Sequence, residues 1–411
     1  MQESAFCLPR IHSIWHVITD MLIREEASQN DNNTSSGKKH KKSKKGSSSE
    51  DSKKNLRNFC EVIIERSLLL SSHDRKHLAF NIIIDLLPRL SPSSIQVILS
   101  SKVVLGLMDI LSNASSWLYS AGQHFLKELV SIVSNDNDRC VAVIINLQKY
   151  SFGRFDSLTK TKTVKGLIAK FHNGQDCLYL VQNLIALFVD EGSVTGEPSD
   201  QSQTTDENSE VGSIEDKEFN GEGNADLLKS WVVNTIPFVL KNLKIITSKE
   251  LKDSDKELTD SDKKELADAE MAKFIEEKFQ VRTEILKFFA VQGLFSASLG
   301  TEVTSFELQE KFKWPKAAIS TSLRNECIEQ LQSLLEDAQK DEALHVGCDV
   351  KSNDLGFYFM RFINTVCNIP SVSLFRTLSS NDDDAFKKTL ATESALFQEV
   401  CNCLLFYLAY S

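Results

Sequence analysis

Residues 56–90 constrain the fold more than any other part of the chain. In the first half of this stretch, apolar residues recur at the i, i+3, i+4, i+7 spacing of one helix face. A second helix follows Ser71 and Ser72, whose hydroxyls can cap it, and Asp74 lies in its first turn. Apolar residues cover most of the circumference of this helix until Pro88, so it must be packed on both sides. They are Leu78, Ala79, Phe80, Ile82, Ile83, Ile84, Leu86 and Leu87.

Stacked helical pairs meet this packing requirement, because each pair covers a face that its neighbour leaves bare. Helical spacing recurs along the chain, strand signals are scarce, and a helix near residue 237 is expected to break at Pro237. Further helices are predicted at residues 8–24, 95–99, 103–111, 116–133, 266–291, 314–338, 355–367 and 382–410. We expect an all-α protein, a HEAT- or armadillo-like helical-repeat solenoid with disordered insertions.

Composition divides the 411 residues into two helical lobes. The first lobe is residues 1–190, with a disordered insertion at 25–54 that has almost no apolar residues to bury. Residues 191–224 contain ten acidic residues and one lysine, which predicts a disordered acidic linker. The second lobe is residues 225–411, with a charged excursion at 248–264.

The insertion at 25–54 contains a dense run of positive charge. Six lysines fall within eight residues: Lys38, Lys39, Lys41, Lys42, Lys44 and Lys45. Such a run is typical of a nuclear import signal, of contact with nucleic-acid phosphates, or of a solvated tether. All three interpretations fit a segment that a receptor can reach in extended form.

A second basic segment lies within folded sequence, at residues 150–172, and contains one acid, Asp156. Its cations are Arg154, Lys160, Lys162, Lys165 and Lys170. A basic stretch is commonly a solvated face, but it is also a candidate surface for an acidic partner or nucleic acid. The folded lobes are otherwise mildly acidic, which argues against a broad duplex-binding surface.

The residues that could support catalysis or metal binding form no recognisable constellation. His12 and His16 stand four residues apart, but no third ligand is apparent. Asp136 with Asp138, and the acids at 382–384, lie at predicted helix starts, where capping explains them. The sequence lacks a glycine-rich phosphate loop, a nucleophile elbow and a paired-cysteine zinc motif. We therefore expect no enzyme activity, cofactor, metal or small-molecule substrate.

Cysteine usage and hydropathy indicate the compartment. The nine cysteines show no framework spacing and lie mostly within apolar helical patterns, which is typical of reduced thiols. No apolar run approaches the length needed to cross a bilayer, and polar residues follow Met1. We expect a protein that is neither secreted nor bound to a membrane.

Three segments resemble a known family: LPRIHSIWHVI at residues 8–18, SLLLSSHDRKHLAF at 67–80 and FDSLTKTKTVKGLI at 155–168. They are similar to the central region of Myb-binding protein 1A and its relatives, also called the DNA polymerase phi or polymerase V family. The resemblance covers the first lobe, and beyond the acidic linker it rests on helical character. Members of that family are longer at both ends, so we expect the chain to be a central fragment.

This resemblance implies a non-catalytic nuclear and nucleolar scaffold in ribosomal RNA gene transcription, ribosome biogenesis and transcriptional co-regulation. Its partners would be proteins, namely transcription factors and nucleolar assembly factors, together with DNA or RNA. A cytosolic or import-linked helical-repeat adaptor is the alternative hypothesis, because a solenoid architecture by itself fits either role.

Overall fold

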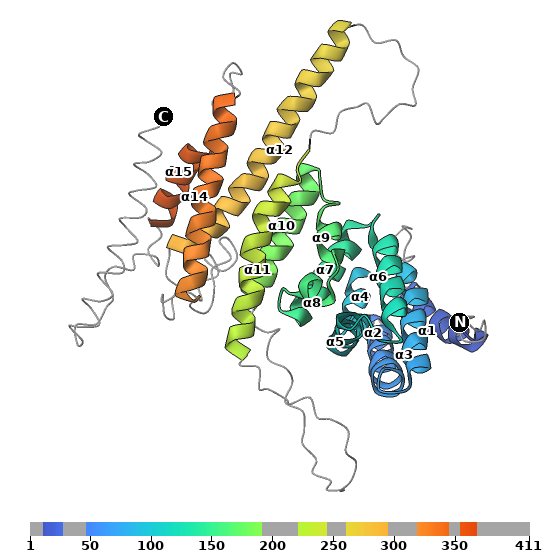
Figure 1. Ribbon diagram of the computed structural model, residues 1–411. Helices are drawn as coiled ribbons and strands as arrows, with labels where there is room; N and C mark the ends of the chain where they lie inside the picture. The colour runs from blue at the N-terminus through green and yellow to red at the C-terminus, as the bar shows by residue number, and fades with distance from the viewer. Residues whose placement is uncertain are drawn as a thin grey trace, which may run out of the picture. The chain divides into compact units, whose positions relative to one another are not determined.

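The computed structural model of the protein describes residues 11–27, 47–190, 221–244, 260–294, 319–344 and 354–367. Every regular element in these residues is a helix (Figure 1). The all-α class predicted from the sequence is therefore confirmed for this part of the chain. Contacts between Cα atoms divide the chain into two compact units, Met1–Lys170 and Phe171–Ser411, called unit 1 and unit 2 below.

Unit 1 consists of helices that follow one another with short connections from α2 onward. They are α1 (Ser13–Ala27), α2 (Ser47–Phe59), the π-helix η2 (Cys60–Leu68), α3 (His73–Leu86), the 3-10 helix η3 (Leu87–Arg89), α4 (Pro92–Ile98), α5 (Ser101–Ser112), α6 (Tyr119–Val133), α7 (Asn137–Ser151), α8 (Phe155–Thr159) and α9 (Thr163–Ile168).

Side-chain caps set the starts of several of these helices. Ser91 accepts a hydrogen bond from the Ser94 N–H at the start of α4, and Pro92 occupies the first helical position. Asp136 accepts from the Arg139 N–H at the start of α7, as predicted. Ser72 is the N-cap residue of α3, but its side chain makes no capping hydrogen bond.

The hairpin predicted at residues 56–90 forms the start of the core. Ile83 on α3 is fully buried, and the Phe80 ring lies 5.0 Å from the Phe125 ring of α6. Helix α3 contacts η2 on one side and α6 on another, so it is packed on both sides as expected. The π-helical geometry of η2 was not predicted, because apolar spacing alone does not separate an α-helix from a π-helix.

Helix α7 lies at the centre of unit 1 and contacts α4, α5, α6, α8 and α9. Two of its buried polar side chains bond the ends of its neighbours. The Asn146 amide donates to the carbonyls of Gln96 at 3.1 Å and Leu99 at 3.3 Å, where α4 ends. The Gln148 Oε1 accepts from the Phe155 N–H at 3.4 Å, where α8 begins. Burial of α7 therefore requires these polar pairings.

Unit 2 is built from five described helices. They are α10 (Gly174–Val189), α11 (Gly221–Lys241), α12 (Asp260–Leu294), α14 (Thr321–Leu344) and α15 (Leu355–Cys367). Helices α10 and α14 each contact both α11 and α12, and α15 contacts α12 and α14. The rings of Phe188 and Phe288 pack edge to face, with their centroids 5.0 Å apart.

A glycine permits one close approach in unit 2. The Gly174 N–H donates to the Glu277 carboxylate at 3.1 Å, and a Cβ added at Gly174 would lie 2.3 Å from the Glu277 Cβ. Any larger residue at the start of α10 would therefore push α12 away.

The predicted edges of the disordered segments are wrong where the structure describes them. Helices α1 and α2 extend into the insertion predicted at 25–54, reaching Ala27 and starting at Ser47. Likewise, α11 begins at Gly221 inside the predicted linker, and α12 begins at Asp260 inside the predicted excursion. Once a packed turn has nucleated a helix, propagation into polar residues adds one hydrogen bond per residue, so composition places helix ends poorly.

Two local predictions are also wrong. Helix α11 continues through Pro237, because the buried side chains of Ile236 before it and Val239 after it keep the helix packed. Trp117 precedes α6 and is 89% exposed, although the predicted helix included it. On α1, Ile14 is 55% exposed, whereas Thr19 is fully buried. The Thr19 hydroxyl donates a hydrogen bond to Asp85 Oδ2 at 3.2 Å.

Helix α10 packs against α11 and α12 and belongs to unit 2, whereas the lobe predicted at 1–190 included it. The lysine run at 38–45 and the helix predicted at 382–410 lie outside the described residues. In the described segments, no single helix is long and apolar enough to cross a membrane. The pair α4 and α5, bent by 63°, meets the length and composition test only when taken together.

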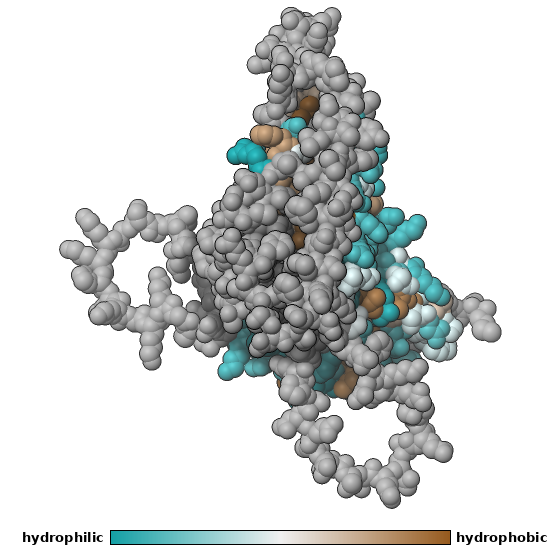
Figure 2. Space-filling view, turned by 90° about the vertical axis from the view of Figure 1, so that its left-hand side faces the viewer, coloured by the Kyte–Doolittle hydropathy of each residue, from teal (hydrophilic) through white to brown (hydrophobic). Residues whose placement is uncertain are grey.

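Figure 2 shows one face of the molecule, coloured by hydropathy. The described residues in view are mainly hydrophilic, and the hydrophobic ones form small separate groups. Groups of this size are ordinary for a protein surface.

Ile83→Asp should unfold unit 1, because it places an unpaired carboxylate at a fully buried position. The penalty is several kcal/mol, a large share of a typical domain stability of about 5–15 kcal/mol. Thermal melting followed by circular dichroism measures the effect. Leu70→Asp is the matched control, since Leu70 is 79% exposed and should tolerate the charge. Equal melting temperatures for the two variants would contradict the packing described here.

Candidate functional site

Residues 159–165, called the Thr–Lys loop below, join α8 to α9 in unit 1 and contain three of the predicted cations. The hydroxyls of its threonines turn inward and bond one another. Thr159 Oγ1 donates to the Phe155 carbonyl at 2.7 Å and lies 2.9 Å from Thr161 Oγ1. Thr163 Oγ1 donates to Thr161 Oγ1 at 3.2 Å. These contacts connect the loop to α8 through side chains as well as backbone.

Asp156 completes this hydrogen-bond network from α8. Its carboxylate accepts the backbone N–H groups of Val164 and Lys165, each at 3.0 Å, in the first turn of α9. It also accepts the Thr161 hydroxyl at 3.3 Å. A carboxylate in this position supplies partners for N–H groups that a helix leaves unpaired and complements the helix dipole. The one acid of the basic segment therefore caps α9 and holds the loop.

The lysines of the basic segment differ from the threonines in burial. Lys160, Lys162, Lys165 and Lys170 are exposed, whereas Thr159 is 1% exposed. Lys160 has the left-handed backbone conformation, with φ of 54°, and its N–H bonds the Asp156 carbonyl to end α8. Threonines and lysines alternate along the loop, where the threonine hydroxyls bond within it and the lysine side chains are exposed.

Arg154 differs from the four lysines. It is the N-cap residue of α8, is half-buried, and its Nε is buried without a hydrogen-bond partner. Four of the five predicted cations are therefore exposed, and Arg154 is half-buried at the start of α8.

Helix α6 adds a wall to this surface. A groove with a volume of about 410 Å³ runs between α6 and the loop, and its lining includes Lys127 and Lys162 at the rim and Leu126 and Val130 at the floor. The remaining lining residues are Gln123, Thr161, Thr163 and Gly166. Sequence reasoning missed Lys127 because only the packing of α6 against α9 brings it beside the loop. No aromatic side chain lines this groove.

The buried thiol nearest this surface is not a nucleophile. Burial raises the pKa of Cys140 to about 12, and the nearby charge of Lys170 opposes that rise without cancelling it. Burial likewise raises the pKa of Cys60, Cys177 and Cys327 to about 12. These four thiols therefore stay protonated at neutral pH and pack as small apolar groups.

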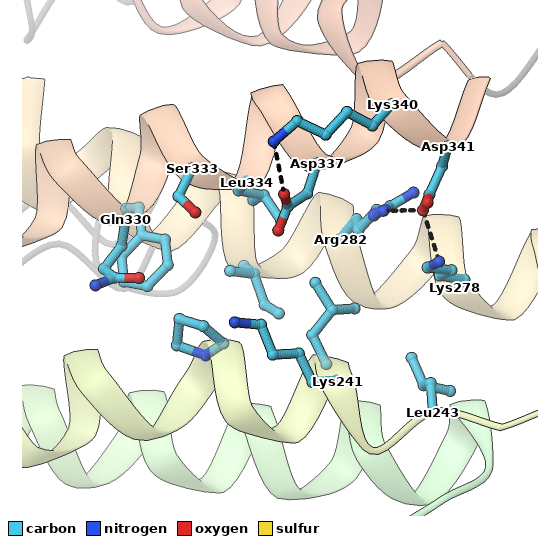
Figure 3. A pocket seen from close by; sticks show the side chains of 14 residues that line it. Lys241, Leu243, Lys278, Arg282, Gln330, Ser333, Leu334, Asp337, Lys340 and Asp341 are labelled. Atoms are coloured by element: carbon cyan, nitrogen blue, oxygen red, sulfur yellow. Dashed lines mark hydrogen bonds and ion pairs between the residues drawn. The ribbon is translucent and has the colours of Figure 1, made fainter. Parts of the chain in front are cut away.

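A second candidate surface lies in unit 2, between α11, α12 and α14 (Figure 3). This groove has a volume of about 280 Å³, and Pro237, Leu240, Ile285, Phe289 and Leu334 form much of its apolar lining. Its charged lining residues are Lys241, Lys278, Arg282, Asp337, Lys340 and Asp341. We call this site the unit 2 groove.

Asp341 organises one end of the unit 2 groove. Its carboxylate accepts from Lys278 Nζ at 2.6 Å and from the Arg282 guanidinium. Burial alone would raise the pKa of Asp341, but these two hydrogen bonds and the two positive charges outweigh it and lower the pKa. Asp341 is therefore ionised at neutral pH, and the cluster is stable as a charged unit.

The residues considered for metal binding or catalysis have other contacts. His12 Nδ1 accepts the Ile14 N–H at 3.2 Å, and His16 Nδ1 lies 3.3 Å from Asp85 Oδ2. Asp136 caps α7, while residues 382–384 lie outside the described part. Across the described ranges, no group of three or more His, Cys, Asp or Glu side chains is placed to hold a metal ion.

Comparison with models of protein families gives a match that covers most of the chain. A sequence model described as DNA polymerase phi matches residues 1–400. The chain belongs to the DNA polymerase phi family. The resemblance seen in three short segments is thereby confirmed, and for this member of the DNA polymerase phi family the match covers both units. Membership of the family indicates a nuclear protein. Neither the curated proteins nor the solved structures compared with the chain gave a match.

Proposed function

We propose that this DNA polymerase phi family member is a non-catalytic scaffold of the nucleus, mainly of the nucleolus. It would act in ribosomal RNA gene transcription, ribosome biogenesis and transcriptional co-regulation, with transcription factors and nucleolar assembly factors as protein partners. Family membership supports the nuclear part of this proposal. The nucleolar and scaffolding parts rest on the surfaces of the two units and on the lysine run at 38–45.

We also propose that unit 1 is a helical-repeat solenoid with a repeat of three helices. Helix α3 contacts α6, α4 contacts α7, α5 contacts α8 and α6 contacts α9. This regular offset is what stacked three-helix repeats of the armadillo kind would produce. A scaffold of this architecture presents residues from successive repeats along a continuous surface, which suits the binding of extended partners.

The outer side of the Thr–Lys loop is the observation that carries the nucleic-acid part of the proposal. Four exposed lysines project from a segment whose threonines and single acid are already bonded internally. Because the neighbouring groove has no aromatic lining on which a base could stack, phosphate contacts are favoured over base recognition. The surface would hold DNA or RNA through the backbone, without reading sequence.

Replacing Lys160, Lys162, Lys165 and Lys170 with Gln should weaken DNA and RNA binding and flatten its salt dependence. Each lost phosphate contact removes about 0.9 of a unit from the slope of log K against log salt for duplex DNA. Fluorescence anisotropy at several salt concentrations measures the slope.

The control for this experiment changes the same amount of charge elsewhere. Lys53, Lys54, Arg57 and Arg75 are exposed cations of α2 and α3 in unit 1, and their replacement with Gln should leave the slope near that of the parent. Equal slopes for the two quadruple variants would remove the Thr–Lys loop from the nucleic-acid interface.

Replacing Lys38, Lys39, Lys41, Lys42, Lys44 and Lys45 with Ala should move the tagged protein toward the cytoplasm, while helical content and melting stay unchanged. The run has no apolar neighbours, so its loss removes charge and no buried contact. Adding an unrelated import signal separates the roles of these lysines. Restored nucleolar accumulation would assign them to import, and a diffuse nuclear protein would assign them to nucleolar binding. Unchanged localisation of the six-Ala variant would exclude both roles.

A further inference from the structure

The unit 2 groove contains an ion cluster that is closed on itself. Asp341 pairs with Lys278 and Arg282, and Lys340 lies 3.5 Å from Asp337. The side chains of Arg282 and Lys278 are 12% and 26% exposed, so the Asp341 part of the cluster is partly covered, whereas Lys340 and Asp337 are more exposed. Figure 3 shows these pairs at one end of the groove. Each acid of the cluster has a cationic partner, and the pairs form a polar wall.

The other end of the groove has polar groups without matched charges. Lys241 extends from α11 away from the Asp341 cluster, and its amine lies on the side of Gln330 in Figure 3. Among the described residues, no carboxylate pairs with Lys241. Ser333 and Gln330 line the same groove from α14 and contribute one hydroxyl and one amide. An exposed cation therefore stands beside neutral hydrogen-bonding groups and an apolar floor.

The volume and the charged lining of the groove determine which class of ligand fits it. Its volume of about 280 Å³ holds a few side chains and not a nucleic-acid backbone with its bases. Four cations and two acids line the groove, so its charge favours an acidic ligand. A purely ionic ligand would leave the apolar side chains of Pro237, Leu240 and Phe289 uncovered. A protein segment with an apolar side chain next to a carboxylate satisfies both kinds of lining.

We propose that the unit 2 groove binds an acidic, partly apolar segment of a partner protein. An apolar side chain of that segment would enter between α11 and α14, and a neighbouring carboxylate would pair with the Lys241 amine. This inference rests on the protein-binding part of the proposed function and is independent of the Thr–Lys loop. It gives the scaffold a second surface, with a ligand class different from that of unit 1.

The test uses the full chain and a fluorescein-labelled peptide of about twelve residues in which aspartates alternate with leucine and phenylalanine. The expected result is saturable binding that weakens about tenfold in Lys241→Glu, because a favourable charge pair becomes a repulsive one. Ser333→Trp should weaken binding to a similar degree by filling the groove without changing charge. Both side chains are exposed, so both variants should melt like the parent.

Further controls show whether the groove and its charge are responsible for the binding. Lys244→Glu changes the same charge at an exposed residue near the end of α11 that does not line the groove, and it should bind the peptide like the parent. A peptide with serine in place of leucine and phenylalanine, and one with asparagine in place of aspartate, should both bind more weakly. Replacement of Lys160 and Lys162 with Gln should leave peptide binding intact, so failure of this inference is separable from failure of the nucleic-acid proposal.

Three outcomes would overturn the inference. Equal peptide affinity in the parent, Lys241→Glu and Ser333→Trp would place binding outside the groove. Equal affinity for the serine peptide would mean that charge alone drives the association. Displacement of the peptide by duplex RNA in the Lys160 and Lys162 variant would instead assign the groove to nucleic acid.

Discussion

The burial of α7 is the constraint on which the rest of unit 1 depends. A helix packed by five neighbours buries many of its side chains, so the polar ones that are buried must find partners inside the protein. Asn146 meets this need by bonding carbonyls at the end of α4, and Gln148 by bonding the N–H that begins α8. A change that moved α7 would therefore displace the helices on either side of it, because an unpaired buried polar group costs about 1–3 kcal/mol.

The same dependence extends from the core to the surface. Gln148 positions Phe155 at the start of α8, and the next residue, Asp156, bonds two N–H groups of α9. The threonines at positions 159, 161 and 163 bond one another, and the lysines that alternate with them are exposed. Fixing lysines on a rigid segment reduces the conformational entropy that binding a phosphate chain would otherwise remove. The position of the basic surface is thus a consequence of core packing.

Sequence reasoning succeeded where the determining contacts are local. The buried faces of α3 and the cap at Asp136 depend on residues a few positions apart, and the structure has them as predicted. Prediction from sequence failed where contacts between elements distant in the chain determine the structure. Asp156 was interpreted as a charge opposing the lysines, although it caps α9, and Lys127 reaches the same surface only through the packing of α6. Pro237 was expected to break α11, yet packing keeps that helix continuous. The unit 2 groove combines three helices far apart in the chain, so no sequence window could reveal it.

Asp156 holds the Thr–Lys loop rigid through its bonds to the first turn of α9. Hydrogen exchange of the Val164 and Lys165 amides tests it most directly, because both N–H groups bond this carboxylate in the folded protein. The account predicts slow exchange at both amides in the parent, comparable to that of α7, and faster exchange at both in Asp156→Ala while α7 stays protected. Exchange in the parent at the rate of an unstructured peptide, or no change in Asp156→Ala, would contradict it.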